Sequence, residues 1–153
     1  MVRTSFIIVI SFFCDSVFNI FLRQDEDSIL FEKGNLDAID EFFAPSYHVK
    51  SPLGMEIKGA EGFKETLTAM QPAFPDMKYQ IEDMFAGDDK VVTRFILSGT
   101  FTGEMMGIAP TGKSMSISGI LITRWENGKE VQAWESIDTL GWYQQLGITP
   151  PTG

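Results

Sequence analysis

The carboxyl group of Asp138 is the clearest candidate for chemistry in the sequence, because it closes an alternating segment, "VQAWESID", at residues 131–138. In a β-strand, successive side chains point to opposite faces, so Trp134 and Asp138 share one face while Glu135 points to the other. An aromatic side chain beside a carboxyl group excludes water from it and raises its pKa. A carboxylate of that kind can remove a proton from the carbon next to a carbonyl group. We therefore predict that Asp138 faces a cavity and acts there as a general acid/base.

The same residue also has a purely structural interpretation. The segment that follows it, "TLGWYQQLG", is typical of a short closing turn or helix, and Asp is a preferred residue immediately before a helix. As an N-cap, the Asp138 side chain would accept a hydrogen bond from a backbone N–H group of that helix. The two roles are compatible, and the sequence does not choose between them.

Further side chains are candidates for contacts in a pocket with Asp138. Two of them, His48 and Lys50, are two residues apart in the short predicted strand "SYHVKSP" and so share one face of it. The alternatives are structural: a lone histidine satisfied within a strand, an arginine in an ion pair, and methionines that pack a loop. The predicted site has Asp138 and His48 as catalytic residues, with substrate contacts from Trp134, Lys50, Tyr47, Arg94, Met105 and Met106.

Composition excludes several classes of function. Lys and Arg number 12 against 21 Asp and Glu, giving a net charge of −9, and such a surface does not suit a nucleic-acid partner. A single cysteine, Cys14, cannot form an internal disulfide, and a single histidine, His48, does not supply a zinc site. The sequence contains no phosphate-binding glycine motif and no G-x-S-x-G nucleophile motif. We therefore expect no cofactor and no metal, and an apolar small molecule as the partner.

Residues 1–22 form an atypical apolar segment before the predicted single domain of residues 23–153. Large apolar residues recur at helical spacing between Phe6 and Ile20, which favours a buried first helix. The basic start and the apolar run at residues 6–14 also resemble an export signal, although no cleavage site follows. An extension without function is the third interpretation. We expect a cytoplasmic protein without a membrane partner, with export through this segment as the alternative.

The remaining pattern predicts an α+β fold of helices followed by a long antiparallel meander. A helix is expected at "GNLDAIDEFFAP", with Asn35 as its N-cap, followed by two short strands and a second helix at residues 60–73. Four strands follow, and the dipeptide Asn127-Gly128 is a strong signal for a tight hairpin between the last two. Helices packed on one face of such a curved sheet leave a cavity at its open end. The opposite face of the sheet stays partly apolar, so we also expect a homodimer.

Several short motifs, in a fixed order, give the chain a resemblance to a known family. They are "FEKGNLDAIDEFFAPSY", "FPD", "GIAPTGK" and a final "W-x-x-x-D" that ends at Asp138. In this order they resemble the SnoaL-like polyketide cyclases, also called ester cyclases, of the nuclear-transport-factor-2-like superfamily, over residues 31–147. The resemblance implies a cone-shaped α+β barrel, in which a curved antiparallel sheet wraps around helices, with a deep apolar pocket. It also implies cofactor-free chemistry on a polyketide ester.

By the same resemblance, Asp138 corresponds to the Asp that acts as general acid/base in an intramolecular aldol ring closure. Lys50 and Phe101 stand where family cyclases commonly carry histidines. The predicted function is therefore aldol cyclisation or isomerisation of an apolar, carbonyl-bearing small molecule. The alternative is a non-catalytic binding or dimerisation module with the same fold.

Overall fold

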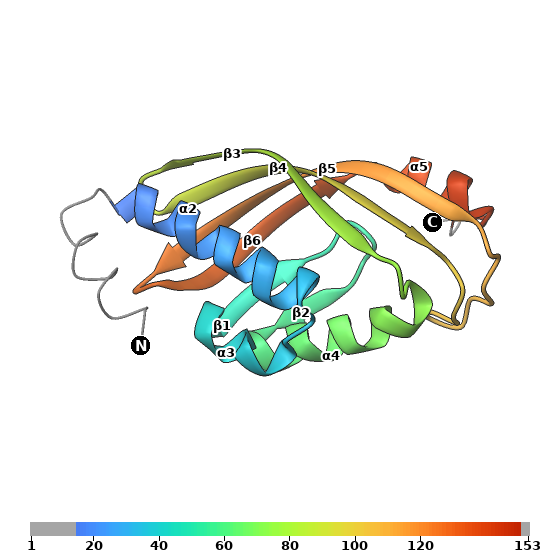
Figure 1. Cartoon of the computed structure of the whole chain (residues 1–153), viewed down its shortest axis with the longest axis horizontal. Coiled ribbons are helices and arrows are strands. Elements are labelled where there is room, and N and C mark those ends of the chain that lie inside the picture. Colours follow the sequence, from blue (N-terminus) through green and yellow to red (C-terminus); the bar gives the residue numbers. More distant parts are fainter. Residues whose placement is uncertain (1–14, 151–153) are drawn as a thin grey trace.

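The computed structural model describes residues 15–150 and consists of a curved six-stranded sheet with helices packed on its inner face (Figure 1). Its helical elements are α2 (Asp15–Glu26), the π-helical turn η1 (Asp27–Glu32), the 3₁₀ turn η2 (Leu36–Ala38), α3 (Ile39–Phe42), α4 (Gly59–Ala73) and α5 (Thr139–Leu146). Its strands are β1 (Phe43–Lys50), β2 (Glu56–Lys58), β3 (Lys78–Gly87), β4 (Lys90–Thr100), β5 (Ser114–Glu126) and β6 (Lys129–Ile137). The predicted α+β class is confirmed.

The strand order is β2-β1-β6-β5-β4-β3, and the sheet is mixed rather than wholly antiparallel. Strands β3 to β6 form the predicted meander, and the hairpin of β5 and β6 turns at Asn127 and Gly128, both with positive φ (52° and 74°). The correction concerns β1, which pairs with β2 in antiparallel fashion but runs parallel to β6. Periodicity identifies a strand, but it does not reveal which edge of a meander an earlier strand joins, or in which direction.

The first predicted helix is shorter than expected. Only Leu36–Ala38 and Ile39–Phe42 are helical, and Asn35 makes no side-chain capping hydrogen bond. At Phe43 the backbone is extended (φ −105°, ψ 135°), and β1 begins there. Pro45 explains the early end, because a proline lacks the N–H group that a helix needs and restricts the residue before it to extended conformations. The second predicted helix is present as α4.

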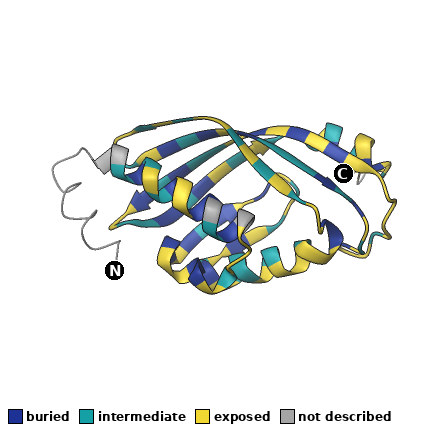
Figure 2. Cartoon of the chain, viewed as in Figure 1, coloured by how far each residue is buried: buried dark blue, intermediate teal, exposed yellow. Residues whose placement is uncertain are grey.

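The core lies between the inner face of the sheet and the helices (Figure 2). One cluster of buried side chains joins α3, β1 and the start of α4, around Phe42 and Phe43. A second cluster joins the end of α4 to β5 and α5, around Phe74 and Phe101. Between these two anchored ends, the stretch of α4 at residues 63–70 lines a cavity.

Helix α2 presents a polar stripe, rather than an apolar one, to the interior. Asn19, Arg23, Glu26 and Asp27 recur at helical spacing and are all buried. Arg23 hydrogen-bonds to Glu26 and forms an ion pair with Asp27, with 3.0 Å between Nη2 and Oδ1. A buried charge is costly unless it is paired, so this stripe needs its partners on the sheet.

Part of the prediction for the N-terminus falls outside the described residues. The predicted helix from Phe6 to Ile20 overlaps α2, in which Ile20 is half-buried, but its residues up to 14 lie outside the described range. The division of the chain after residue 22, and the choice between a buried helix, an export signal and an extension, therefore stay predictions. Within the described residues, no helix is long and apolar enough to cross a membrane.

A bulge in β6 brings a further carboxyl group to α2. The register between β5 and β6 shifts between Arg124 and Trp125, so β6 carries one extra residue there. As a result Glu130 and Val131 are both buried, where strict alternation would bury only one of them. Burial raises the pKa of Glu130 well above its ordinary value, and the neighbouring carboxylate of Glu26 raises it further.

The buried guanidinium group of Arg23 is therefore surrounded by three carboxyl groups, those of Glu26, Asp27 and Glu130. Together these four residues connect α2 to β6. Burial also raises the pKa of Glu26, although the charge of Arg23 opposes this effect. Glu26 and Glu130 lie within hydrogen-bonding reach of each other. Two neighbouring carboxylates cannot both ionise cheaply in a buried site, so we expect the pair to share one proton.

The contribution of Glu130 to stability should therefore decrease as the pH rises. Its pKa is raised in the folded chain, so its contribution is fully present below the ordinary pKa of 4.5 and is lost as the pH rises through the folded value. Glu130→Gln removes this titration. The free energy of unfolding of the variant, relative to the wild type, should increase by about 1–3 kcal/mol between about pH 5 and about pH 9. Urea unfolding at both pH values measures the difference.

Glu65→Gln, on the exposed face of α4, is the matched control and should keep the wild-type pH dependence of stability. A Glu130→Gln protein whose stability varies with pH as in the wild type would contradict the shared proton.

Candidate functional site

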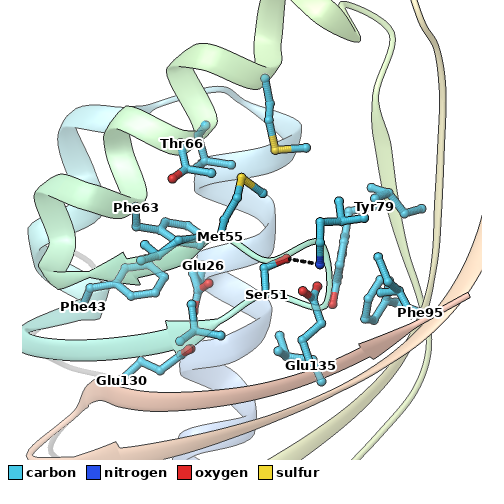
Figure 3. A pocket seen from close by; sticks show the side chains of 18 of the residues that line it. Glu26, Phe43, Ser51, Met55, Phe63, Thr66, Tyr79, Phe95, Glu130 and Glu135 are labelled. Atoms are coloured by element: carbon cyan, nitrogen blue, oxygen red, sulfur yellow. Dashed lines mark hydrogen bonds between the residues drawn. The ribbon is translucent and has the colours of Figure 1, made fainter. Parts of the chain in front are cut away.

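A cavity of about 140 Å³ lies between the inner face of the sheet, α2 and α4 (Figure 3). At roughly 10–15 Å³ for each molecule, it has room for on the order of ten waters. Aromatic rings form much of its wall. The rings of Phe43 and Phe63 are stacked with their centroids 4.4 Å apart, and those of Tyr79 and Phe95 with their centroids 4.5 Å apart. Such walls suit a flat, apolar ligand.

A glycine in β5 makes room for one of these rings. Gly119 pairs with Phe95 of β4 on one side and with Ile137 of β6 on the other. A β-carbon at Gly119 would come within 2.4 Å of the Phe95 ring and 2.9 Å of the Ile137 side chain. Phe95 and Ile137 both line the cavity, so the missing side chain of Gly119 determines where this part of the wall lies.

Glu135 brings a carboxyl group into the cavity. It lies in β6 opposite Leu121 of β5, and both side chains line the cavity together with Ile137. Figure 3 shows the Glu135 side chain pointing inward from the strand. Burial raises the pKa of Glu135, and the positive charge of Arg23 only partly opposes this effect. In its ionised form, this carboxylate is a stronger base than one exposed to water.

Hydroxyl groups supply other polar parts of the lining. Thr66 of α4 donates its proton to the carbonyl group of Gly62, at 2.8 Å. Ser51 follows β1, and its Oγ accepts a hydrogen bond from the N–H group of Leu53, at 3.2 Å. Burial raises the pKa of Tyr47 well above its ordinary value, so its hydroxyl group stays protonated and can donate a hydrogen bond.

The charged cluster on α2 meets the lining at Tyr79, and the charge of its Arg23 reaches Glu135. Arg23 donates a hydrogen bond from Nη2 to the hydroxyl oxygen of Tyr79, at 3.3 Å, and its guanidinium carbon lies 5.7 Å from the centroid of that ring. Glu130 precedes Glu135 by five residues, which is roughly 16 Å along a strand at about 3.3 Å per residue. The cavity therefore has two separate acidic regions, and Glu135 is the more accessible one.

Asp138 lies outside the lining of this cavity. It is exposed, and its Oδ1 accepts a hydrogen bond from the backbone N–H group of Gly141, at 2.8 Å, as the N-cap of α5. Trp134 is 43% exposed. The two residues share one face of β6, as predicted, but it is the outer face, because Glu135 and Ile137 occupy the inner one. The structure therefore does not bring Asp138 to this cavity, and the capping alternative describes the hydrogen bond that its side chain makes.

Among the candidates on β1, the structure separates Tyr47 from its neighbours. Tyr47 is buried and lines the cavity. His48 is half-buried, and its Nε2 lies 3.0 Å from Oε1 of Glu56 on β2, so it takes the structural role of a paired strand histidine. Lys50 is exposed. His48 and Lys50 do share a face, as predicted, but strand alternation puts that face opposite the cavity.

The remaining predicted contacts also lie away from the cavity lining. Arg94 is exposed on β4 and hydrogen-bonds to Glu82 of β3. Met105 is buried in the second core cluster, where it packs the loop after β4, and Met106 is 66% exposed. These positions agree with the structural alternatives. Within residues 15–150, no group of three His, Cys, Asp or Glu side chains is placed to hold a metal ion.

The carboxyl group of Glu135 is the functional candidate that sequence reasoning missed. Alternation correctly places it opposite Asp138, but alternation alone does not say which face meets the helices. A signal was present, because Val131, Ala133 and Ile137 share the face of Glu135, whereas the other face carries Gln132, Trp134, Ser136 and Asp138. The more apolar face is the core face. For Glu130 the sequence pattern gives no such signal, because its side chain is buried only as a result of the bulge in β6.

The N-cap role of Asp138 gives a test that uses stability alone. Asp138→Ala removes the acceptor for the N–H group of Gly141 and should lower the free energy of unfolding by about 1 kcal/mol. Asp138→Asn should leave stability nearly unchanged, because Asn caps a helix about as well as Asp. Urea unfolding of both variants measures the difference, and equal stability of the Ala and Asn proteins would contradict the capping role.

Comparison with known proteins identifies the family of the chain. The sequence profile of the SnoaL-like polyketide cyclase family matches residues 23–146. Among characterised relatives, the aklanonic acid methyl ester cyclase AcmA of Streptomyces galilaeus is 28% identical over 120 residues, which cover 76% of this chain and 83% of that protein.

Solved structures agree on the fold. TsrD from Streptomyces laurentii superposes with a TM-score of 0.75 at 25% identity, over 86% of this chain and 96% of that one. Wild-type IdmH from Streptomyces antibioticus superposes with a TM-score of 0.67 at 28% identity, over 82% of this chain and 98% of that one. These likenesses confirm the predicted cone fold. Because the family profile spans most of the sequence, the chain belongs to the SnoaL-like polyketide cyclase family.

Proposed function

We propose that the chain catalyses cofactor-independent acid/base chemistry on an apolar carbonyl compound, with Glu135 as the general base and acid. The observation that carries the proposal is a partly accessible carboxyl group, with a raised pKa, inside a cavity with aromatic walls. Membership of the family supports the reaction class, and AcmA, named as a cyclase of a polyketide ester, indicates the kind of substrate. Glu135 thus takes the role that the sequence resemblance implied for Asp138.

The proposed reaction needs only one proton carrier. Glu135, in its carboxylate form, takes a proton from the carbon next to a ligand carbonyl group and leaves an enolate. The enolate carbon attacks a second carbonyl carbon of the same molecule, which forms a C–C bond and moves the C=O electron pair onto oxygen. The resulting alkoxide takes the proton back from Glu135. In an isomerisation, the proton would return to a different carbon. A pKa raised toward the working pH suits a group that must both accept and donate a proton.

One observation favours the alternative, a protein that binds a small molecule without chemistry. Phe101, at a position where family cyclases commonly have a histidine, is buried in the core and stacks on Phe74 with the ring centroids 5.4 Å apart. Lys50, at the other such position, is exposed on the outer face. Neither residue supplies a polar group to the cavity, so catalysis would depend on Glu135 and its neighbours.

Deuterium exchange into acetophenone separates the two candidates without knowledge of the natural substrate. The methyl protons of this apolar ketone lie next to its carbonyl group, and proton NMR in deuterium oxide follows their loss. The wild type should accelerate the exchange. Glu135→Gln keeps the shape of the side chain but removes the base, so the catalysed rate should fall by about 10²–10⁴-fold. Its stability near neutral pH should not decrease, because a desolvated carboxyl group is replaced by a neutral amide.

Two matched variants serve as controls for this experiment. Glu65→Gln, on the exposed face of α4, and Asp138→Asn, which keeps the helix cap, should both exchange at the wild-type rate. Wild-type protein that binds acetophenone without catalysing exchange, or a Glu135→Gln protein with full activity, would contradict the proposal and favour the binding module.

We infer further that the chain forms a homodimer through the outer face of its sheet. Trp134 is 43% exposed and Ile120, on the neighbouring strand, is 48% exposed. In the sheet register Trp134 pairs with Ile122, and Ile122 pairs with Val92, so an apolar patch crosses β6, β5 and β4. An exposed apolar patch of this kind is typical of an interaction surface, and a second copy offers the same patch across a two-fold axis.

Trp134→Lys should convert the dimer to a monomer, because it places a charge within the apolar patch. The association constant should fall by about 10²-fold or more, the usual effect of losing a central aromatic contact. Sedimentation equilibrium measures it. Met106→Lys removes an apolar side chain that is even more exposed, from the loop after β4, and should leave the association unchanged. A monomeric wild type, or a Trp134→Lys protein that remains dimeric, would rule out this interface.

A further inference from the structure

The sheet register brings the hydroxyl group of Ser51 into the neighbourhood of Glu135. In the parallel pair of β1 and β6, Val49 lies opposite Ala133. Two residues further along both segments, alternation puts Ser51 and Glu135 on the same inner surface. Both residues line the cavity, and Ser51 is buried. In the view of Figure 3, their side-chain oxygen atoms point toward the same part of the cavity.

The turn after β1 holds Ser51 in a defined position. The Ser51 N–H group donates to the carbonyl oxygen of Met55, at 2.7 Å, and its own carbonyl oxygen accepts from the N–H group of Gly54, at 2.9 Å. Its Oγ accepts from the N–H group of Leu53, at 3.2 Å. A hydroxyl group whose oxygen accepts a backbone hydrogen bond keeps its proton for another partner, and polarisation makes it a better donor. Ser51 therefore presents a positioned O–H donor.

Three other hydroxyl groups belong to the lining, and that of Tyr79 accepts a hydrogen bond from Nη2 of Arg23, at 3.3 Å, on the side of α2. Thr66 already donates its proton to the carbonyl oxygen of Gly62, at 2.8 Å. The Tyr47 hydroxyl group is buried, and the charges of Glu130, Glu26 and Glu135 all raise its pKa. Ser51 combines a polarised O–H group with a position just beyond the end of β1, on the inner surface that also carries the proposed base.

We propose that Ser51 donates the hydrogen bond that holds the carbonyl oxygen of a ligand whose adjacent carbon lies against Glu135. The proposal rests on the proposed function of Glu135 and adds the oxygen-binding half of the site. Its ligand class is a ketone or ester with an enolisable carbon. Before proton transfer the negative charge is on Glu135, and afterwards it is on the ligand oxygen. A hydroxyl group near both oxygens can donate to the ligand as this charge develops, which stabilises the enolate.

Infrared difference spectra of acetophenone with a carbon-13 carbonyl label test this hydrogen bond directly. A hydrogen bond lowers the frequency of the carbonyl stretching band, so the band in the wild type should lie below its position in hexane. In Ser51→Ala the band of the bound ketone should return toward the hexane position. Ser51→Thr keeps both the donor and the acceptor and should keep the wild-type band. Catalysed deuterium exchange should fall by about 10²-fold in the Ala variant and by less than about tenfold in the Thr variant.

Several results would overturn the proposal: a lowered band that persists in Ser51→Ala, a wild-type band at the hexane position, or a wild type that does not bind acetophenone. Thermal unfolding of both variants checks that the turn still folds. The spectra do not depend on turnover, so the two proposals fail separately. If the Glu135→Gln protein catalysed deuterium exchange at the full rate, the proposed role of Glu135 would be wrong. A carbonyl stretching band that shifts in Ser51→Ala would still support the oxygen-binding site.

Discussion

The chemistry of the cavity depends on which face of β6 meets the helices. Glu135 and Ile137 point inward, and the register fixes this face through Gly119 and Leu121 of β5. Because strand side chains alternate, a shift by one residue would bury Trp134 and turn Glu135 to solvent. The bulge then breaks the alternation once and adds Glu130 to the inner surface. Strand β6 therefore supplies a carboxyl group to each acidic region of the cavity.

The second constraint is the cost of the charges buried between α2 and β6. One guanidinium group and three carboxyl groups are removed from water there, and such clusters persist only with close pairing and further hydrogen bonds. The aromatic and aliphatic clusters at the two ends of α4 supply apolar burial that can offset this cost. The same exclusion of water acts on Glu135, so the apolar packing that stabilises the fold also makes its carboxylate more basic.

Local signals in the sequence were sufficient for much of the fold. The strands of the meander, the hairpin at Asn127-Gly128 and helix α4 all follow from periodicity and turn chemistry. The candidate site was only half predictable. Alternation correctly grouped Trp134 with Asp138, and Glu135 with Ile137, but the resemblance pointed to Asp138, which caps α5, and not to the carboxyl group that lines the cavity.

The features that escaped prediction all depend on contacts between distant segments. The parallel pairing of β1 with β6 and the bulge beside Glu130 exist only in the assembled sheet. The polar stripe of α2 is stable because Glu130 and Tyr79 meet Arg23 there. These partners are far from Arg23 in the sequence, so the local sequence pattern could not show that its charge is buried.

The parallel pairing of β1 with β6 also sets the order in which the protein can be assembled. It joins Phe43 to Glu130 and Val49 to Ala133, segments that are more than eighty residues apart in the sequence. Contacts of such high sequence separation slow folding, because a long loop must close before they form. During synthesis, β1 and α4 leave the ribosome well before β6. The aromatic rings of Phe43 and Phe63 therefore remain uncovered by β6 until that strand has been made. The wall of the cavity is complete only when β6, which carries Glu130, Glu135 and Ile137, has been translated.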